Sequence, residues 1–363
     1  MVDNFKKPKL KYYNAYLDND GELIKSSNPE MQTFLKGKYG KTFMRCNSGY
    51  LRELFDEIKN NPECSYVTYL NDFIKENYDG KALPIKSVSV LVKDVPYGKE
   101  TGGYMEEVVS RLGNVFGIPV PFNKYVKDKD GNYLLSVDFI GADERFDNLN
   151  KYFTDYDLIE RYNISDSDDS LYQNSVGNNF SLEEWYKNFM EYPRNLSTKK
   201  PLSDKQREDM FIQFIPRYLF RKWVVSDYDL YSRNEGVLYN NQTGEFKTLS
   251  YDFEYAFSYM YDVFQLAHDI AFLMKKYPNE LDKFLEKYNQ NADKLDGIFE
   301  SIDDILICRA VRNYVTKNLL FLLHLYNKAK DIVSSDDFDG DYSHLYNKLT
   351  EFHKSFDQLN KQM

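Results

Sequence analysis

The chain has 363 residues, enough for one large two-lobed domain or two ordinary domains. Its formal net charge of −10 gives no electrostatic footprint for nucleic acid or for an anionic membrane, so neither is an expected partner. Aromatic residues make up 17% of the chain, and a sequence so rich in large apolar rings is not that of a disordered protein.

The cysteines and the N-terminal segment bear on where the protein works. The three cysteines are odd in number and far apart, which is typical of a reducing compartment rather than of a disulfide framework. The N-terminal residues lack the apolar stretch of a signal peptide, and no uninterrupted apolar run approaches membrane-spanning length. We therefore expect a cytoplasmic protein.

The predicted elements begin with residues 1–85, whose clearest signal is a helical pattern over residues 48–61. The run KSVSVLVKDV at residues 86–95 is rich in Val and predicts a buried strand with Lys93 near its end. The glycine-containing segment that follows predicts a flexible linker. Apolar side chains then recur at helical spacing over residues 104–117.

A second apolar strand, YLLSVDFIG at residues 133–141, runs into a polar turn. Strand patterns dominate before this point and helical patterns after it, so we expect an α+β fold with two lobes. The first would be a small, mixed β-rich lobe over residues 1–140, and the second a mainly helical lobe over residues 141–363. Residues 164–179, acidic and rich in Ser and Asn, predict a surface insertion. Helical periodicity marks five later segments: residues 203–223, 263–277, 279–291, 303–333 and 344–363.

The first of these helical segments carries signals for its start and for a bend. Ser203 and Gln206 stand at the spacing of a capping box, in which each side chain accepts a backbone N–H group of the other residue. Pro216 lacks a backbone donor and is expected to kink the helix.

The segment over residues 223–257 holds the pattern that bears most on function: Asp229, then Asn234, a strand-turn-strand and Asp252. Phosphoryl transfer to a hydroxyl needs a carboxylate that accepts or orients the hydroxyl proton, and oxygen ligands that hold Mg²⁺ on the nucleotide phosphates. Magnesium usually takes only one or two carboxylates beside the phosphates, so a loop Asn and a strand-end Asp suffice. We predict Asp229 as the catalytic base and Asn234 and Asp252 as Mg²⁺ ligands, with ATP as cosubstrate.

The spacing of Asp229 and Asn234 has a plainer interpretation. In a chain rich in Asp and Asn it arises by chance, and either residue, or Asp227, could simply cap a turn. The predicted hairpin and the YDFE sequence after it favour the catalytic interpretation, because they supply the structural context that the motif requires. Asp227 is expected to cap or support the loop.

The order strand, loop, helix and GIPVP turn matches the nucleotide-binding lobe of kinases, where a strand Lys contacts the nucleotide phosphates and pairs with a helix Glu. Lys93 is the candidate lysine, although Lys86 and Lys99 lie nearby and an exposed strand-end lysine is the plainer interpretation. Glu106 and Glu107 are the candidate partners, against the plainer interpretation of a solvated helix face.

The end of the second strand is a candidate hinge between the lobes. In kinases the hinge offers backbone N–H and C=O groups to adenine. Asp138, Phe139 and Ile140 are therefore candidates for nucleotide binding by position rather than by side chain.

The segments LVKDVPYGKETGGYMEEVVSRLGNVFGIPV, YLLSVDFIG, DYDLYSRNEGVLYNN and LSYDFEYAF together resemble the HipA-like serine/threonine kinases, including the CtkA-type relatives. The resemblance covers roughly residues 86–330. It implies a protein-kinase-like fold, a protein substrate and a regulatory partner protein. It also implies that Lys93 is the nucleotide lysine with Glu106 as its partner, and it agrees with the roles given to the three residues of the catalytic segment.

The chain departs from the family pattern inside the loop. Tyr231 stands where the family commonly has His, and Ser226 and Asp227 replace a Gly-Asn pair. DLYSRN, DFEYAF and AHDIAF also resemble the aminoglycoside and choline kinases, which phosphorylate small alcohols. Three interpretations therefore stay open: a protein kinase, a small-molecule kinase, and a pseudokinase that acts as a binding module.

Overall fold

The structure is a computed structural model. It describes residues 16–17, 23–24, 41–47, 87–128, 131–137, 144–153, 180–196, 198, 200–240, 242–258, 263–300, 302, 304–336 and 338–360. The predicted helix at residues 48–61, the predicted insertion at residues 164–179 and the candidate hinge residues Asp138, Phe139 and Ile140 lie outside the described residues.

The chain divides into two compact units, each made of two separate stretches of sequence. Unit 1 comprises Met1–Leu149 and Asn234–Tyr255, and unit 2 comprises Asn150–Arg233 and Ala256–Met363. The predicted lobes are continuous stretches, whereas each unit takes in a segment from the other half of the chain. The lobe boundary at residue 140 stays a prediction.

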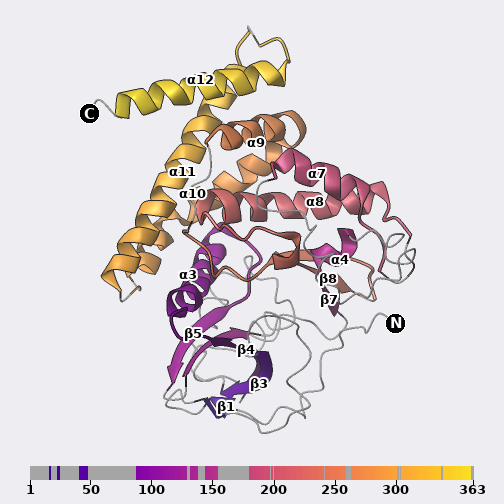
Figure 1. Cartoon of the computed structure of the whole chain (residues 1–363). Coiled ribbons are helices and arrows are strands. Elements are labelled where there is room, and N and C mark those ends of the chain that lie inside the picture. The colour runs from indigo at the N-terminus through magenta and orange to yellow at the C-terminus, as the bar shows by residue number, and fades with distance from the viewer. Residues whose placement is uncertain are drawn as a thin grey trace. The chain divides into compact units, whose positions relative to one another are not determined.

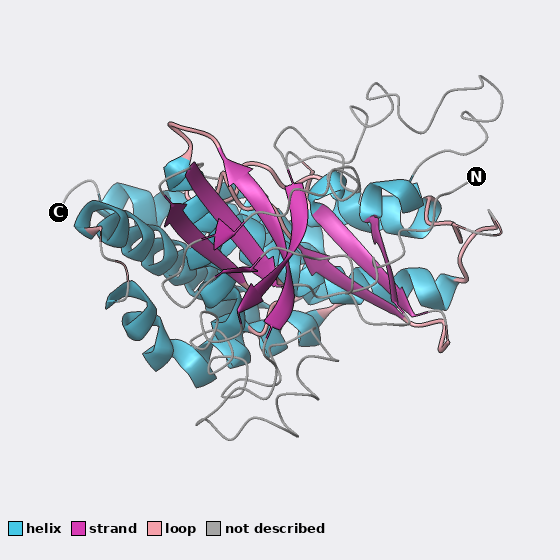
Figure 2. Cartoon of the chain, turned by 90° about the horizontal axis from the view of Figure 1, so that it is seen from below, coloured by secondary structure: helices cyan, strands magenta, loops and turns pink. Residues whose placement is uncertain are grey.

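Unit 1 is built on a four-stranded antiparallel sheet in the order β3-β4-β6-β5. Figure 1 labels β3, β4 and β5 of this sheet, and Figure 2 shows the strands in magenta. The strands of the sheet are β3 (Lys41–Asn47), β4 (Ser87–Val95), β6 (Gly131–Val137) and β5 (Asn123–Asp128), and a short pair, β1 (Tyr16–Leu17) with β2 (Leu23–Ile24), precedes them. The strand predicted at residues 86–95 is confirmed as β4. It lies inside the sheet, where Lys93 is paired with Lys41 on one side and Leu134 on the other.

Helix α3 (Glu100–Phe116) packs against β5 and β6. It begins before the predicted start at residue 104, so the second half of the predicted linker, residues 100–103, is the first turn of the helix. Gly102 and Gly103 mark close packing there. A Cβ atom on Gly103 would lie 3.0 Å from Val95 Cγ2 and 3.1 Å from the ring of Tyr125. Glycine is needed because the first turn of the helix lies directly against the sheet.

A second sheet in unit 1 has the order β7-β8-β9, with β7 (Glu144–Asn148), β8 (Glu235–Asn240) and β9 (Phe246–Ser250). The hairpin predicted in this part of the chain is confirmed. Asn240 closes the turn by accepting the N–H groups of Gln242 and Thr243, and Gly244 adopts a φ of +74°. β7 was not predicted because ERFDN lacks an apolar alternation. Because β7 pairs with β8, the hairpin and β7 form one sheet of unit 1.

Unit 2 is helical. Its helices are α4 (Leu149–Phe153), α7 (Leu182–Glu191), α8 (Asp204–Tyr218), η4 (Leu219–Val224), η5 (Ser232–Asn234), α9 (Val263–Lys276), α10 (Pro278–Glu300), α11 (Ile305–Val333) and α12 (Tyr342–Asn360), with the first and the fifth reaching one residue into unit 1. The helices predicted over residues 263–277 and 303–333 are confirmed, the one over residues 344–363 is confirmed as far as Asn360, where the described residues end, and the one over residues 279–291 extends to Glu300. Within the described residues, no helix combines the length and apolarity needed to cross a membrane.

Helix α7 was not predicted, although its start carries a sequence signal. Ser181 and Glu184 form a complete capping box at its N-terminus. Its apolar face forms part of an aromatic core. The ring of Phe214 from α8 lies 4.6 Å from that of Trp185 and 5.2 Å from that of Phe189, measured between ring centres.

Helix α8 begins as predicted, with Ser203 and Gln206 forming a capping box. The chain continues as a helix through Pro216 and changes to the π-helical turn η4 three residues later. Proline has no N–H group for the carbonyl four residues earlier, and a local π turn is a common accommodation of an interrupted helix. In the wider turn both Arg221 and Lys222 are fully buried.

Candidate functional site

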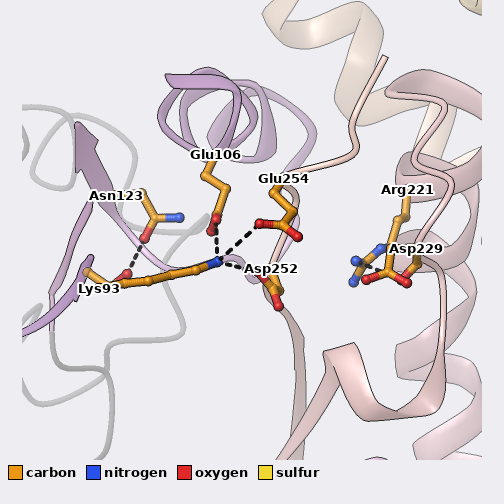
Figure 3. A network of polar contacts seen from close by, with 8 residues as sticks. Lys93, Glu106, Asn123, Arg221, Asp229, Asp252 and Glu254 are labelled. Atoms are coloured by element: carbon orange, nitrogen blue, oxygen red, sulfur yellow. Dashed lines mark hydrogen bonds and ion pairs between the residues drawn. The ribbon is translucent and has the colours of Figure 1, made fainter. Parts of the chain in front are cut away.

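In unit 1 the ammonium group of Lys93 lies among three carboxylates (Figure 3). Its Nζ is 2.6 Å from Asp252 Oδ1, 3.0 Å from Glu106 Oε1 and 3.9 Å from Glu254 Oε2. The predicted ion pair of Lys93 with Glu106 is therefore confirmed. Glu254 was not predicted, although it stands two residues after Asp252 in the YDFE sequence.

The two glutamates of α3 point to different partners. Successive residues of an α-helix are rotated by about 100° around its axis, so neighbours face different elements. Glu106 faces Lys93, whereas Glu107 accepts the N–H group of Tyr125 at 2.8 Å and pairs with Lys124 at 3.2 Å. Glu107 thus joins α3 to β5, and Glu106 faces the predicted site.

Burial and charge act in opposite directions on this cluster. Burial alone would lower the pKa of Lys93, but the charges of Glu106 and Asp252 outweigh it and raise the pKa above its ordinary value. Burial raises the pKa of Glu106 to about 7 against the opposing pull of Lys93. One ammonium group among three carboxylates agrees with both pKa shifts. The lysine stays charged, and the most buried carboxyl group holds its proton more tightly.

The predicted Mg²⁺ ligands flank the open end of the β8–β9 hairpin. Asn234 directly precedes β8, Asp252 lies just after β9, and the carbonyl of Asn234 accepts the N–H group of Tyr251 at 3.0 Å. Asp252 has a φ of +62°, a left-handed conformation that costs a non-glycine residue energy and clusters at functional sites.

The donor set suits magnesium, which prefers carboxylate and amide oxygens. Asp252 is 30% exposed in its side chain, and the surrounding carboxylates exceed the ammonium charge. The described part of the chain contains no group of three or more His, Cys, Asp or Glu residues placed to hold a metal ion. Magnesium usually keeps several waters and binds substrate phosphates beside one or two protein carboxylates.

In unit 2 a buried ion pair holds the loop that contains Asp229. Arg221 Nε donates to Asp227 Oδ2 at 2.6 Å, and both side chains are fully buried. Asp227 Oδ1 accepts the N–H group of Asp229 at 3.0 Å. Arg221, which lies beside Asp229 in Figure 3, donates from Nη2 to the Asp229 carbonyl at 3.1 Å. The supporting role predicted for Asp227 is confirmed. Burial raises its pKa to about 6, opposed by the charge of Arg221.

A left-handed residue lies at the start of this loop. Ser226 has a φ of +48°, at the position where the HipA-like pattern has Gly. Asn318 of α11 donates to Ser226 Oγ at 2.7 Å and to the carbonyl of Val224 at 3.1 Å. These bonds hold a conformation that serine alone adopts only at a cost. No local sequence signal identifies Asn318 or Arg221.

The structure thus brings Lys93, Glu106 and Asp252 together in unit 1, with Asn234 beside them along the hairpin. Asp229 belongs to unit 2, where its side chain is 14% exposed. The roles predicted for these residues stay predictions.

Several solved structures match this fold, and two of them are described by what they share with the chain. The chain is similar to the proinflammatory kinase CtkA of Helicobacter pylori, with 12% sequence identity and a TM-score of 0.48, over 70% of this chain and 91% of that chain. It is also similar to a chain of the toxin–antitoxin complex of HipA, HipB and operator DNA from Shewanella oneidensis MR-1, with 14% identity and a TM-score of 0.36, over 68% of this chain and 62% of that chain. No family model matches the chain, and a search of the curated proteins finds no match.

The predicted α+β class is confirmed, with small sheets in the N-terminal part and helices in the C-terminal part.

Proposed function

We propose that the chain is an ATP- and magnesium-dependent phosphotransferase whose acceptor is a Ser or Thr hydroxyl of a protein. The observation that carries the proposal is the position of Lys93, bonded to Glu106 of α3 and to Asp252 after β9. A strand lysine held by a helix glutamate, next to an Asp suited to magnesium, is the arrangement that phosphoryl transfer uses to neutralise phosphate charge.

Each residue has a separable task in this proposal. Lys93 would bind phosphate oxygens, and Glu106 would orient it. Asn234 and Asp252 would hold Mg²⁺, which supplies neutralisation of the phosphate charge when bound. Asp229 would accept the proton of the acceptor hydroxyl, a step that requires hydrogen-bond reach to the acceptor but no contact with the metal.

The chemical step is tested with Asp229→Asn. The substitution keeps the shape of the side chain and removes its anionic acceptor, so transfer from radiolabelled ATP should be abolished while ATP binding and thermal stability persist. Transfer at the wild-type rate would move the catalytic role to another residue or exclude the mechanism.

The nucleotide site is tested with Asp252→Ala and Asn234→Ala. Both remove a predicted metal ligand, so calorimetry should show weaker magnesium-dependent ATP binding while binding without magnesium changes little. Glu183→Ala serves as a control, because this carboxylate lies on α7 in an exposed pair with Lys187. Unchanged binding in both folded variants would contradict the assignment.

The acceptor class is tested by offering different hydroxyls to the same enzyme. Phosphate on Ser or Thr of the chain itself or of dephosphorylated casein supports the protein-kinase proposal, which rests on the sequence resemblance to HipA-like kinases. Transfer only to an added aminoglycoside or choline would identify a small-molecule kinase. Magnesium-dependent ATP binding without transfer to any acceptor would identify a pseudokinase.

A further inference from the structure

The guanidinium group of Arg233 lies against the predicted catalytic carboxylate. Its Nη2 atom donates to Asp229 Oδ1 at 2.9 Å, and its central carbon lies 4.5 Å from the centre of the Tyr231 ring. The side chain of Arg233 is 47% exposed and that of Asp229 is 14% exposed. A half-exposed cation, supported on an aromatic face, therefore meets a carboxylate that is largely shielded from water.

This contact is not a routine pair on a helix surface. In an α-helix, residues four apart are neighbours by default, and such exposed pairs add little to stability. Here the chain between the two residues is a turn followed by the single 3₁₀ turn η5, so the contact depends on the conformation of this loop. Tyr231 adds a second restraint, because a cation over an aromatic ring is attracted to its face.

The main chain of Asp229 is held by different residues. Its N–H group donates to Asp227, and its carbonyl accepts from Arg221. These bonds fix the backbone, whereas the side-chain torsions of Asp229 depend on the groups that meet its carboxylate. Arg233 is such a group, and a bond to one carboxylate oxygen determines where the other oxygen lies.

We infer that Arg233, supported by Tyr231, is a positioning residue that holds Asp229 in the orientation in which it receives the proton of the acceptor hydroxyl. The inference rests on the proposed phosphotransferase activity and deepens it. It also gives a role to Tyr231, which stands where the resembling kinases have His: its ring carries the guanidinium group. General-base catalysis depends on such orientation, since the base must lie within hydrogen-bond reach of the proton it accepts.

The test measures transfer from radiolabelled ATP to dephosphorylated casein and to the chain itself. Arg233→Ala should lower kcat by about a hundredfold, the scale of loss expected when a reacting group is misplaced, with little change in KM for ATP. Arg233→Lys should retain an intermediate rate, because it keeps the charge but not the planar group. Tyr231→Phe keeps the ring face and should retain more activity than Tyr231→Ala.

Chemical rescue separates positioning from a structural role. Guanidinium chloride at a low, non-denaturing concentration should restore part of the rate of Arg233→Ala and none of the rate of Asp229→Asn. A loop that had merely lost stability would not recover when guanidinium is added.

The chain provides a matched control in Arg312. This arginine is also 47% exposed, pairs with Asp296 at 3.2 Å and lies 5.2 Å over the ring of Phe299, but it joins α10 and α11. Arg312→Ala removes the same kinds of contact and should leave the transfer rate at the wild-type value.

The outcomes distinguish this inference from the function on which it rests. Wild-type kcat in Arg233→Ala, an equal loss in Arg312→Ala, or a loss that guanidinium does not relieve would overturn the inference while leaving the proposed function in place. If the wild-type chain transfers no more phosphate than Asp229→Asn, the proposed function is wrong and the inference falls with it.

Discussion

Lys93 shows what can be predicted for a single residue and what cannot. Its place near the end of an apolar strand, followed by a helix that carries Glu106, is sufficient to predict their ion pair. The bond from Lys93 to Asp252 and the contact with Glu254 cannot be predicted in the same way, because Asp252 lies 159 positions further along the chain than Lys93. A contact over that distance depends on how the strands pair, which residue type and local spacing do not specify.

Asp227→Asn should strongly destabilise the protein. It removes the charge that compensates Arg221 in a site where both side chains are fully buried. Breaking one partner of a buried ion pair costs about 3–5 kcal/mol, so urea denaturation at neutral pH should show a loss of that size in the free energy of unfolding. The control is Asp282→Asn, which breaks an exposed pair with Lys330 and should cost at most about 1 kcal/mol. Similar losses in both variants would contradict the prediction.

Glu106 gives stability a pH dependence of defined sign. Burial raises the pKa of its carboxyl from 4.5 to about 7. Between these values the folded chain binds a proton that the unfolded chain has released, so the free energy of unfolding falls as pH rises. The contribution is at most about 3.5 kcal/mol, because the pKa rises from 4.5 to about 7 and one pKa unit corresponds to about 1.4 kcal/mol.

Glu106→Gln should remove this contribution, since glutamine has no proton to release. Urea denaturation at several pH values between the two pKa values would then give a shallower fall for the variant than for the wild type. An identical fall in both proteins would assign the pH dependence to other groups, of which Asp227 is the first candidate.

At the scale of elements, prediction succeeds where a periodic pattern is long. Helices α9, α11 and α12 each carry apolar residues over several turns, and all three are found where the sequence places them. β7 is too short to carry a pattern, and the predicted start of α3 is wrong because Gly102 and Gly103 indicate a linker by residue type but lie inside the helix. The same residue type serves close packing at one position and a turn at another, and only the neighbouring elements decide between them.

Gly103 and Gly297 should therefore respond in opposite ways to alanine. Both lie inside helices, where alanine is favoured over glycine by about 1 kcal/mol. A Cβ atom on Gly297 of α10 meets nothing within 4 Å, so Gly297→Ala should raise the free energy of unfolding. A Cβ atom on Gly103 would instead press on Val95 and Tyr125. Overpacking costs about 1–3 kcal/mol, so Gly103→Ala should lower the free energy of unfolding. Urea denaturation measures both, and a stabilised Gly103→Ala would refute the packing argument.

At the scale of the whole molecule, the sequence predicts two lobes but not the exchange of segments between them. Residues 234–255 are part of unit 1 because β7 pairs with β8 and because Asp252 and Glu254, two of the three carboxylates around Lys93, follow β9. This segment follows the loop of Asp229 directly in the chain. Asp229, Asn234 and Asp252 therefore lie in one short part of the sequence, although Asp229 belongs to unit 2 and the other two belong to unit 1.

The discontinuous make-up of unit 1 can be tested with fragments. A chain of residues 1–149 lacks the partner strand of β7 and leaves Lys93 without Asp252, so it should show no cooperative urea transition and poorly dispersed amide signals in NMR spectra. Joining residues 234–255 to it through a Gly/Ser linker should restore both. The matched control is the same fusion with Val237→Asp, which places a charge at a fully buried position of β8 and should abolish the restored transition. A cooperative transition in residues 1–149 alone, as steep as that of the fusion, would show that the hairpin is dispensable to this unit.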